Sequence, residues 1–495
     1  MKNILKYQII LIMVLGFGSC VSLDTPPTSE ITENVYWQSK ADFDMALTGC
    51  YAGLQSNVMA SSQPFFDCMT DNSSVSSQSA YGLNIGYFLE GAISPSNGGI
   101  VSDLYANCYK AIIRTNIFLK NIDSYKGSDI AASRTQLIGE ASFIRGYCYW
   151  MLYLYYGEVP IVKEVLDLTN QIKPKSTLNE VYLSTMADIE LAIKSLPDKT
   201  YQAMAGHATK SAALALKSRI LMYQATLNRS TPDVSLFQQA YDAISQITVY
   251  NNTSLDVDYA KIFQPATQEA SNEIMFSIKY KAPSNYSNWD IGASLYNNVK
   301  PTKDLWDSYE AGDKRRDATI ALNGKYTWPG GQQITLPTTY AFLVKAARPV
   351  LTPASIWTGS EQSDQDAVII RYGEVLLLKA EVANELGKPI SEIVNYINTV
   401  RTRSGLGALL MSLSQAQLRT AIRNERRVEC CFEFMRWYDL KRWGILNSRL
   451  NGFNPDPIVN PGRSIIYPER QFYLPLPQYE IDISNGILIQ NPAYN

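Results

Sequence analysis

The stretch SQAQLRTAIRNERRVECCFEFMRWYDLKRWG, residues 414–444, decides the fold of this chain. Its first turn carries Ser414 and Gln417 at the spacing of a capping box, a common start of a helix. Its apolar residues then recur near the helical period, at Leu418, Ile422, Val428 and Phe432. Such a period predicts that one face of the helix enters a core. We therefore predict one packed helix over residues 414–444.

The same stretch is dense in charge. Glu425, Glu429 and Glu433 stand four residues apart, so they share a helical face and repel one another unless cations lie between them. Nearby basic residues could neutralise these glutamates: Arg426, Arg427, Arg436, Lys441 and Arg442. A solvated face is the ordinary explanation of such a pattern, but the aromatic residues Phe434, Trp437, Tyr438 and Trp443 favour burial. We predict a charge lattice that stabilises the fold. A metal site of the Glu-x-x-His kind is excluded, since the stretch has no histidine.

These residues resemble a family signature. The runs ERRVE (425–429), FE (432–433) and RWYDLKRWG (436–444) are similar to the pattern ERRxE…FEGxRWxDLxRWG of the SusD/RagB family of outer-membrane nutrient-binding lipoproteins. We assign the one departure, a replaced glycine, to Met435. Residues 109–116, 139–160, 371–377 and 472–495 resemble further segments of the same family.

The resemblance implies a mainly α fold, a SusD-like α/α superhelix of tetratricopeptide-like helix pairs with an irregular loop-rich lobe. Helical periods support it over residues 42–54, 104–122, 139–156, 177–196, 209–225, 368–386 and 391–404. The small residues Ala212, Ala213 and Ala215 suit close helix packing, although no exact repeat period is kept. Residues 273–278 predict a short strand, and Pro475 and Pro477 predict an extended wrap at the C-terminal end.

The N-terminal residues predict export. Lys2 and Lys6 precede the apolar run 9–17, which is too short to span a bilayer and is typical of a secretory signal. The run ends in FGSC at residues 17–20, which resembles a lipobox and implies lipidation of Cys20; ordinary cleavage after Ser19 is the alternative. We expect a lipoprotein signal peptide (1–19), a lipidated tether (20–40), an N-terminal helical region with tetratricopeptide-like repeats (41–247) and a C-terminal SusD/RagB region (248–495) that includes the irregular lobe 248–366.

Composition narrows the class of partner. Over 495 residues, 44 Lys and Arg stand against 46 Asp and Glu, so nothing favours nucleic acid. Of seven cysteines, six follow Cys20 and lack the CxxC spacing of zinc or redox sites. We expect buried thiols rather than disulfides, since several of the six lie on apolar helical faces.

Catalytic motifs are scarce. His207 is the only histidine, at a predicted helix entrance where a capping or surface role is favoured over catalysis. We expect no cofactor, no metal and no enzyme, although two carboxylates in a cleft would suffice for a glycoside hydrolase.

Two irregular intervals, 59–102 and 248–366, hold aromatic residues among Ser, Asn and Gly without a helical period. Sugar binding uses exposed rings beside polar side chains, so we place the ligand site where these intervals meet. The candidates are Asp71, Asn72, Tyr81, Tyr87, Tyr286, Trp289, Tyr296 and Trp328.

The resemblance implies capture of oligosaccharide on the outer face of a Gram-negative outer membrane and delivery to a SusC-like TonB-dependent transporter. Binding of peptides or other nutrients is the alternative, with a glycoside hydrolase ranked below both. A purely structural tetratricopeptide scaffold would not explain the aromatic loops.

Overall fold

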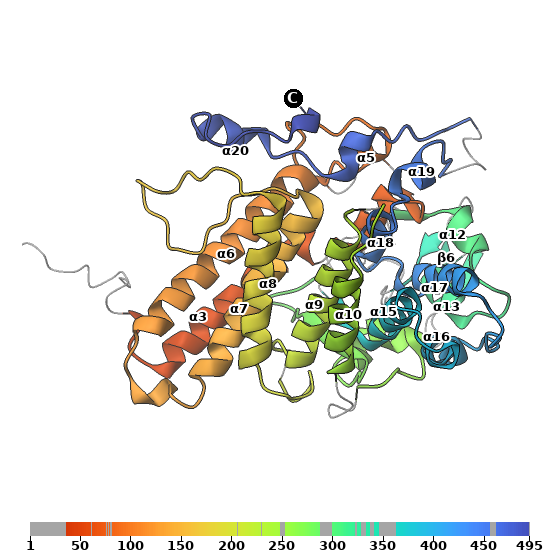
Figure 1. Cartoon of the computed structure of the whole chain (residues 1–495), viewed down its shortest axis with the longest axis horizontal. Coiled ribbons are helices and arrows are strands. Elements are labelled where there is room, and N and C mark those ends of the chain that lie inside the picture. Colours follow the sequence, from red (N-terminus) through yellow and green to blue (C-terminus); the bar gives the residue numbers. More distant parts are fainter. Residues whose placement is uncertain are drawn as a thin grey trace, which may run out of the picture.

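The computed structural model describes residues 36–494 apart from gaps at 61, 76, 78, 80–81, 205, 229, 248–252, 288–298, 322–323, 328–332, 337–340, 346–362 and 456–461. A row of packed helices dominates it: in Figure 1, α3 to α10 stand side by side, and α15, α16 and α17 continue the array but are seen nearly end-on. The row contains α3 (Lys40–Ala52), α6 (Ile100–Ser124), α7 (Arg134–Tyr155), α8 (Leu178–Ser195), α9 (Lys210–Ala225), α10 (Val234–Ser245), α15 (Tyr372–Glu385), α16 (Ile390–Arg403) and α17 (Gln415–Cys430). The predicted mainly α fold of stacked helix pairs is confirmed.

Local sequence fixes where these helices begin. At α8 the Thr177 hydroxyl accepts from the Glu180 backbone N–H while the Glu180 carboxylate accepts from the Thr177 N–H, and Ser414 and Gln417 do the same at α17. Thr209 and Asp233 cap α9 and α10 through their side-chain oxygens.

Glycines on α7 set how closely the first helices pack. A Cβ on Gly146 would lie 2.6 Å from Ile189 Cδ1, and one on Gly139 would lie 2.9 Å from Ser195 Cβ and 3.1 Å from the Leu196 backbone nitrogen. Both contacts are with the α8 helix or its end, so α7 and α8 approach through the missing side chains. The faces around them are almost wholly buried.

The prediction of one helix over 414–444 is wrong. Helix α17 ends at Cys430, and α18 (Met435–Arg442) begins after a break at residues 431–434. Phe432 and Phe434 have φ of 64° and 65°, the left-handed region. Written letter by letter, FEFMRW against FEGxRW puts the replaced glycine at Phe434, so its assignment to Met435 is wrong by one residue. The glycine of the signature matches a position that needs positive φ.

The loop-rich lobe is built from short two-stranded sheets. β2 (Ile274–Ile278) pairs antiparallel with β8 (Ala367–Arg371), and β1 (Ser73–Val75) with β3 (Val299–Pro301). Two further pairs are β4 (Ile320–Ala321) with β7 (Phe342–Leu343), and β5 (Gly324–Thr327) with β6 (Gln333–Leu336). The predicted strand at 273–278 is confirmed, but the helix predicted over 368–386 begins only at Tyr372, because the β-branched run Val368–Ile369–Ile370 extends into β8.

Residues 59–102 are less irregular than the sequence predicts. Much of the interval folds into α4 (Gln63–Phe66), η3 (Asp67–Met69), β1 and α5 (Gly86–Leu89), whose side chains are largely buried. The other irregular interval, residues 248–366, also contains short helical elements: η7 (Tyr259–Phe263), α11 (Pro265–Gln268), α12 (Lys303–Asp307) and α13 (Lys314–Thr319). Their few turns give no clear helical period, which is why sequence pattern alone missed them.

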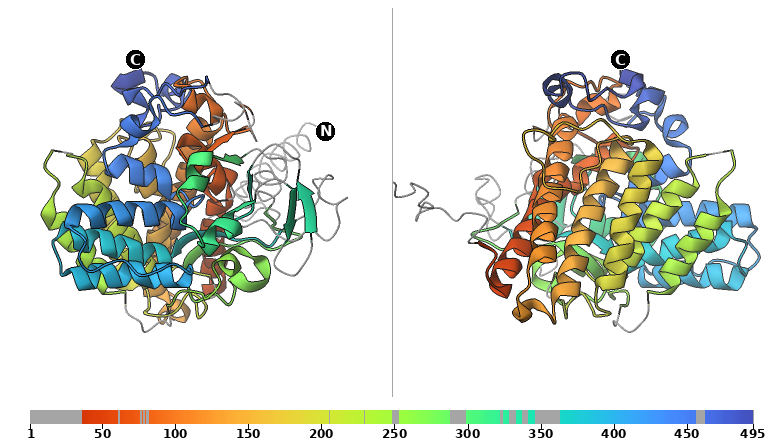
Figure 2. Two further views of the ribbon diagram at one scale, coloured as in Figure 1. Left: turned by 90° about the vertical axis from the view of Figure 1, so that its right-hand side faces the viewer. Right: turned by 60° about the vertical axis from the view of Figure 1, so that its left-hand side comes forward.

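The C-terminal segment crosses one end of the helix row, above α5 and α6 in Figure 1 and at the top of both views in Figure 2. It contains α19 (Leu446–Leu450), η9 (Glu469–Phe472), α20 (Gln478–Ile483) and η10 (Pro492–Tyr494). The Leu474 N–H donates to the Tyr155 carbonyl at 2.7 Å, and the Gln478 N–H to the Pro95 carbonyl at 3.0 Å. The predicted extended segment ends at Pro477, because α20 begins at the next residue, Gln478.

Candidate ligand-binding site

The glutamates of α17 are buried and matched by cations, as predicted. Arg371 Nη1 lies 2.5 Å from Glu429 Oε1, and Arg315 Nη1 lies 2.9 Å from Glu429 Oε2; Arg403 makes a third pair with Glu429. Burial alone would raise the pKa of Glu429, but Arg403, Arg371 and Arg315 hold it well below its ordinary value. A carboxylate so enclosed has no face left for a ligand.

The cations that answer these glutamates are not the ones we predicted. Glu425 pairs with Arg315 and Arg401, and Glu433 with Arg371 and Lys345, all from other elements. The basic residues of the stretch itself bind other groups. Arg426 and Arg427 follow Glu425 by one and two residues and so project from other faces of α17, whereas Arg436, Lys441 and Arg442 lie on α18, after the break. Arg426 and Arg442 hold Asp439, Arg427 and Arg436 hold Asp71, and Lys441 donates to the Leu154 carbonyl.

Asp71 and Asn72, two predicted ligand residues, belong to this buried lattice. Arg436 binds the Asp71 carboxylate through Nε and Nη2, each at 2.7 Å, and Arg449 Nε adds a contact at 2.6 Å. The Asn72 Oδ1 accepts from Arg427 Nε at 2.9 Å. Burial would raise the pKa of Asp71, yet the Arg436 and Arg427 guanidinium groups hold it below its ordinary range. Both side chains anchor the loop to α17 and α18 and are buried there, so neither is exposed to a ligand.

The two irregular intervals do meet. β1 pairs with β3 in the register Ser73↔Pro301, Ser74↔Lys300 and Val75↔Val299. The Thr302 N–H donates to the Asn72 carbonyl at 2.9 Å, and the Thr302 hydroxyl to the Asp71 carbonyl at 2.8 Å. The lobe therefore rests on a base that the arginines of α17 and α18 hold in place.

Two tyrosines predicted to contact a ligand, Tyr87 and Tyr286, lie within the described ranges. Tyr87 is part of α5 and is partly buried against the main core. Tyr286 stands between two bridges, one joining Lys281 to Asn285 and the next joining Ser287 to Ser363, and it is 44% exposed. Of these two tyrosines, only Tyr286 has the exposure that suits contact with a ligand.

Tyr81, Trp289, Tyr296 and Trp328 lie outside the described residues. They stay predictions that rest on sequence pattern.

His207 is bound to a buried carboxylate. Its Nδ1 lies 2.5 Å from Glu140 Oε2, and the Tyr51 hydroxyl donates to the same oxygen at 2.8 Å. The hydrogen bond to Glu140 raises the pKa of His207. The Ala208 N–H donates to the Tyr51 hydroxyl, so the group ties α3, α7 and the start of α9 together. This geometry supports a structural role.

Two cavities among the described residues lie beside helices of the row. One, of about 250 Å³, lies between α3 and β2 and is lined by His207, Lys279 and Asn285 among others. A second, of about 760 Å³, lies between α6, α7 and residues 163–167, where Lys163 and Arg145 both bind Asp188. Burial lowers the pKa of Lys163 to about 8.

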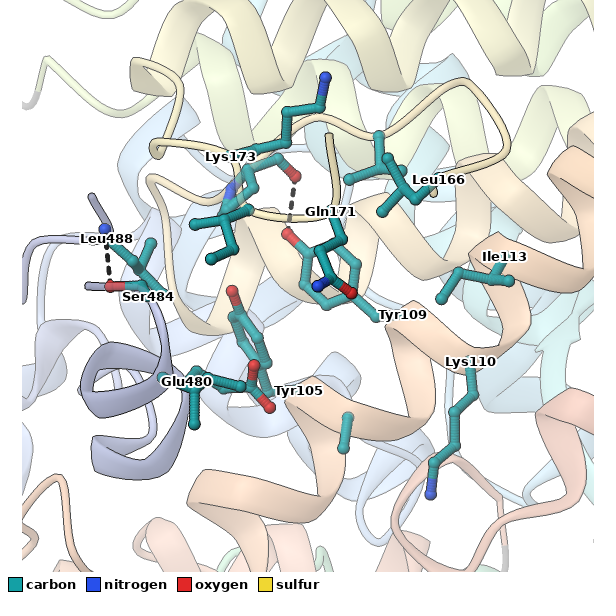
Figure 3. A pocket seen from close by; sticks show the side chains of 15 residues that line it. Tyr105, Tyr109, Lys110, Ile113, Leu166, Gln171, Lys173, Glu480, Ser484 and Leu488 are labelled. Carbon is teal, nitrogen blue, oxygen red and sulfur yellow. Dashed lines mark hydrogen bonds between the residues drawn. The ribbon is translucent and has the colours of Figure 1, made fainter. Parts of the chain in front are cut away.

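A third cavity, of about 320 Å³, lies where α6, residues 160–173 and α20 meet (Figure 3). Tyr105 and Tyr109 form one wall, with ring centroids 4.7 Å apart. The helical period over residues 104–122 gives no sign of a cavity, because the other walls come from distant segments of the chain. The only hint is the spacing of two tyrosines one helical turn apart.

Two family matches cover most of the chain. A family described as "SusD family" matches residues 260–494, and one described as "Starch-binding associating with outer membrane" matches residues 23–222. The chain belongs to the SusD family. The motifs that resemble this family fall inside the matched ranges, apart from the last residue, Asn495.

Relatives in the SusD family match over nearly their full length. SusD-like protein P2 from Formosa agariphila is 26% identical, over 99% of this chain and 100% of that protein. A crystal structure of a SusD-like protein from Bacteroides fragilis has a TM-score of 0.76 at 22% identity, over 94% of this chain and 100% of that one. Surface glycan-binding protein A from Bacteroides uniformis has a TM-score of 0.74 at 24% identity, over 92% and 100%. These structures share the fold.

Two further findings concern only the part of this SusD-family chain that the structure describes. It holds no cluster of three or more His, Cys, Asp or Glu side chains placed to bind a metal ion. None of its helices is both long and apolar enough to span a bilayer.

The six cysteines after Cys20 are buried free thiols, as predicted: Cys50, Cys68, Cys108, Cys148, Cys430 and Cys431.

Proposed function

We propose that this protein binds oligosaccharide at the cell surface and delivers it to a SusC-like TonB-dependent transporter. One observation carries the proposal: two SusD-family matches account for residues 23–222 and 260–494, and one of those families is described as starch-binding and associated with the outer membrane. The Bacteroides uniformis relative is a surface glycan-binding protein, which supports the same class of ligand.

The proposed ligand site is the exposed surface of the irregular lobe. The pairing of β1 with β3 supports this location, since it joins the two intervals that carry the candidate aromatic residues. Exposure of Tyr286 supports it as well. A sugar presents an apolar C–H face and a polar rim, so an exposed ring with amide and hydroxyl neighbours is a suitable platform. Trp289, Trp328 and Tyr81 are further proposed contacts, with Tyr87 and Tyr296 after them.

An anchor and a partner complete the proposed function. Lipidated Cys20 would hold the protein to the outer membrane, facing outside, with residues 21–40 as the tether. The helix row would dock on the transporter, because an array of packed helices offers a broad, rigid face. Purification from solubilised outer membranes should recover a large TonB-dependent receptor with the protein. Its repeated absence under an inducing nutrient would count against delivery without touching glycan binding.

The binding function is tested by titration calorimetry against a panel of oligosaccharides. We expect at least one glycan to bind the parent protein, and Trp289→Ala, Trp328→Ala and Tyr81→Ala each to weaken it several-fold, since an aromatic contact contributes about 1 kcal/mol. Circular dichroism checks that each variant is folded. Binding of peptides but no glycan would support the alternative nutrient class. Release of cleaved sugar from the panel would show an enzyme.

A further inference from the structure

The cavity at the end of the helix row has mostly apolar walls. Tyr105, Tyr109 and Ile113 of α6 form one side, and Ile483 and Leu488 of the C-terminal segment the other. The hydroxyl groups of Tyr109 and Ser484 are used by the protein itself, although the Gln171 amide also lines the cavity. The Tyr109 hydroxyl donates to the Pro160 carbonyl at 2.6 Å, and the Ser484 hydroxyl donates to the Ile481 carbonyl and accepts from the Leu488 N–H. A sugar would find few partners for its hydroxyl groups here.

One carboxylate at this cavity has no partner among the described residues. Glu480 of α20 lines the cavity, next to the Tyr105 ring in Figure 3, and its side chain makes no hydrogen bond or ion pair within the described ranges. Lys110 points away from the cavity in the same view, and Lys173 is bound to Glu164. Burial raises the pKa of Glu480, and no described cation offsets the rise. A half-buried carboxylate of this kind is stabilised by a cation that arrives from outside.

Ile113 and Ile483, which both line the cavity, form an apolar rim, since each is also partly exposed to solvent. Large hydrophobic side chains on the same segments face solvent: Ile113, Leu168, Tyr479, Ile483, Ile487 and Ile489. Leu168 is 88% exposed and Tyr479 is 70% exposed. Exposed apolar side chains at the mouth of a pocket are typical of a surface that binds another macromolecule. A small cation would need only the cavity and not this rim.

We propose that this cavity docks a partner polypeptide, which inserts a lysine or arginine side chain flanked by apolar residues. The aliphatic stem of that side chain would pack against Tyr105, Tyr109 and Leu488, and its cationic head would reach Glu480. The flanking apolar residues would cover the exposed isoleucines of the rim. The site shares no residue with the irregular lobe, so it stands whether or not the lobe binds glycan.

Methyl NMR on the full chain with labelled isoleucine tests the docking site, because Ile113, Ile172 and Ile483 all line the cavity. The probe is acetyl-Leu-Arg-Leu-amide, and its comparison is the same peptide with citrulline, which is neutral and nearly isosteric. We expect the arginine peptide to shift these methyl signals and the citrulline peptide to bind about tenfold more weakly, or about 1.4 kcal/mol.

Variants separate charge from shape. Glu480→Gln should weaken the arginine peptide about tenfold, to the level of the citrulline peptide. The matched control Glu469→Gln, on an exposed carboxylate that does not line the cavity, should leave the affinity unchanged. The proposal is overturned if neither peptide shifts the methyl signals, or if both bind Glu480→Gln as they bind the parent. If free butylguanidinium binds with the same affinity as the arginine peptide, the site takes a small cation and the proposed polypeptide partner is overturned.

Discussion

Replacing Glu429 by alanine should destabilise the protein without weakening its ligand binding. Glu429 is fully buried and pairs with Arg315, Arg371 and Arg403, so its loss leaves three buried guanidinium groups short of an anion. Breaking a buried ion pair costs about 3–5 kcal/mol. An unfolding entropy of about 2.1 cal/mol/K per residue gives about 1 kcal/mol/K for 495 residues, and so a fall in Tm of about 3–5 °C.

Differential scanning calorimetry measures this fall, with Asp44→Ala as the control. Asp44 pairs with Lys40 at 2.6 Å, but both side chains are largely exposed, so Tm should change by less than about 0.5 °C. The pKa of Glu429 is depressed in the folded protein, so its contribution is present above the unfolded pKa of about 4.3 and is lost as pH falls through the folded pKa. A Glu429→Ala protein as stable as the parent that has lost ligand binding would refute the structural role.

The helix packing, the His207 contact and the proposed anchor give three further predictions. Gly139→Ala should lower stability by about 1–3 kcal/mol, because the new Cβ would clash with Ser195 and the Leu196 backbone. The control Gly49→Ala should not lower stability, since no atom of the described residues, apart from its chain neighbours and the surrounding helix backbone, would lie within 4 Å of its Cβ. Chemical denaturation compares the two variants. His207→Ala should cost more stability at pH 6 than at pH 9, because the pKa of His207 is raised in the folded protein. The stabilisation that His207 provides is therefore present below its unfolded pKa of about 6.5 and is lost as pH rises through its folded pKa. Equal losses of stability at both pH values would contradict this. Cys20→Ala should release the protein from the membrane fraction, and an unlabelled parent protein after metabolic lipid labelling would sink the anchor.

Much of the helix row could be predicted from sequence because its signals are local. Thr177 with Glu180, and Ser414 with Gln417, mark helix starts within four residues of chain. The break after α17 could not be predicted from pattern alone, because Phe434 occupies a left-handed position where glycine is the usual residue. Glu433 lies within that break, where Arg371 and Lys345 meet it, and Arg436 reaches Asp71 from the helix that follows.

The candidate site shows the limit of local pattern more clearly. Asp71 and Asn72 stand among polar loop residues in the sequence, yet Arg427 and Arg436, more than 350 residues later, enclose them. The cavity beside Tyr105 depends equally on Glu480 from the far end of the chain. Contacts between segments so distant are set by tertiary packing, which a helical period does not encode.

The most direct test of the account compares glycan affinity in two variants by titration calorimetry. We propose that the lattice around α17 stabilises the fold while the irregular lobe binds the ligand. Glu429→Ala, measured below its lowered Tm, should bind the identified oligosaccharide as the parent does, and Trp289→Ala should bind it several-fold more weakly with an unchanged Tm. The claim is contradicted if Trp289→Ala binds like the parent while folded Glu429→Ala does not.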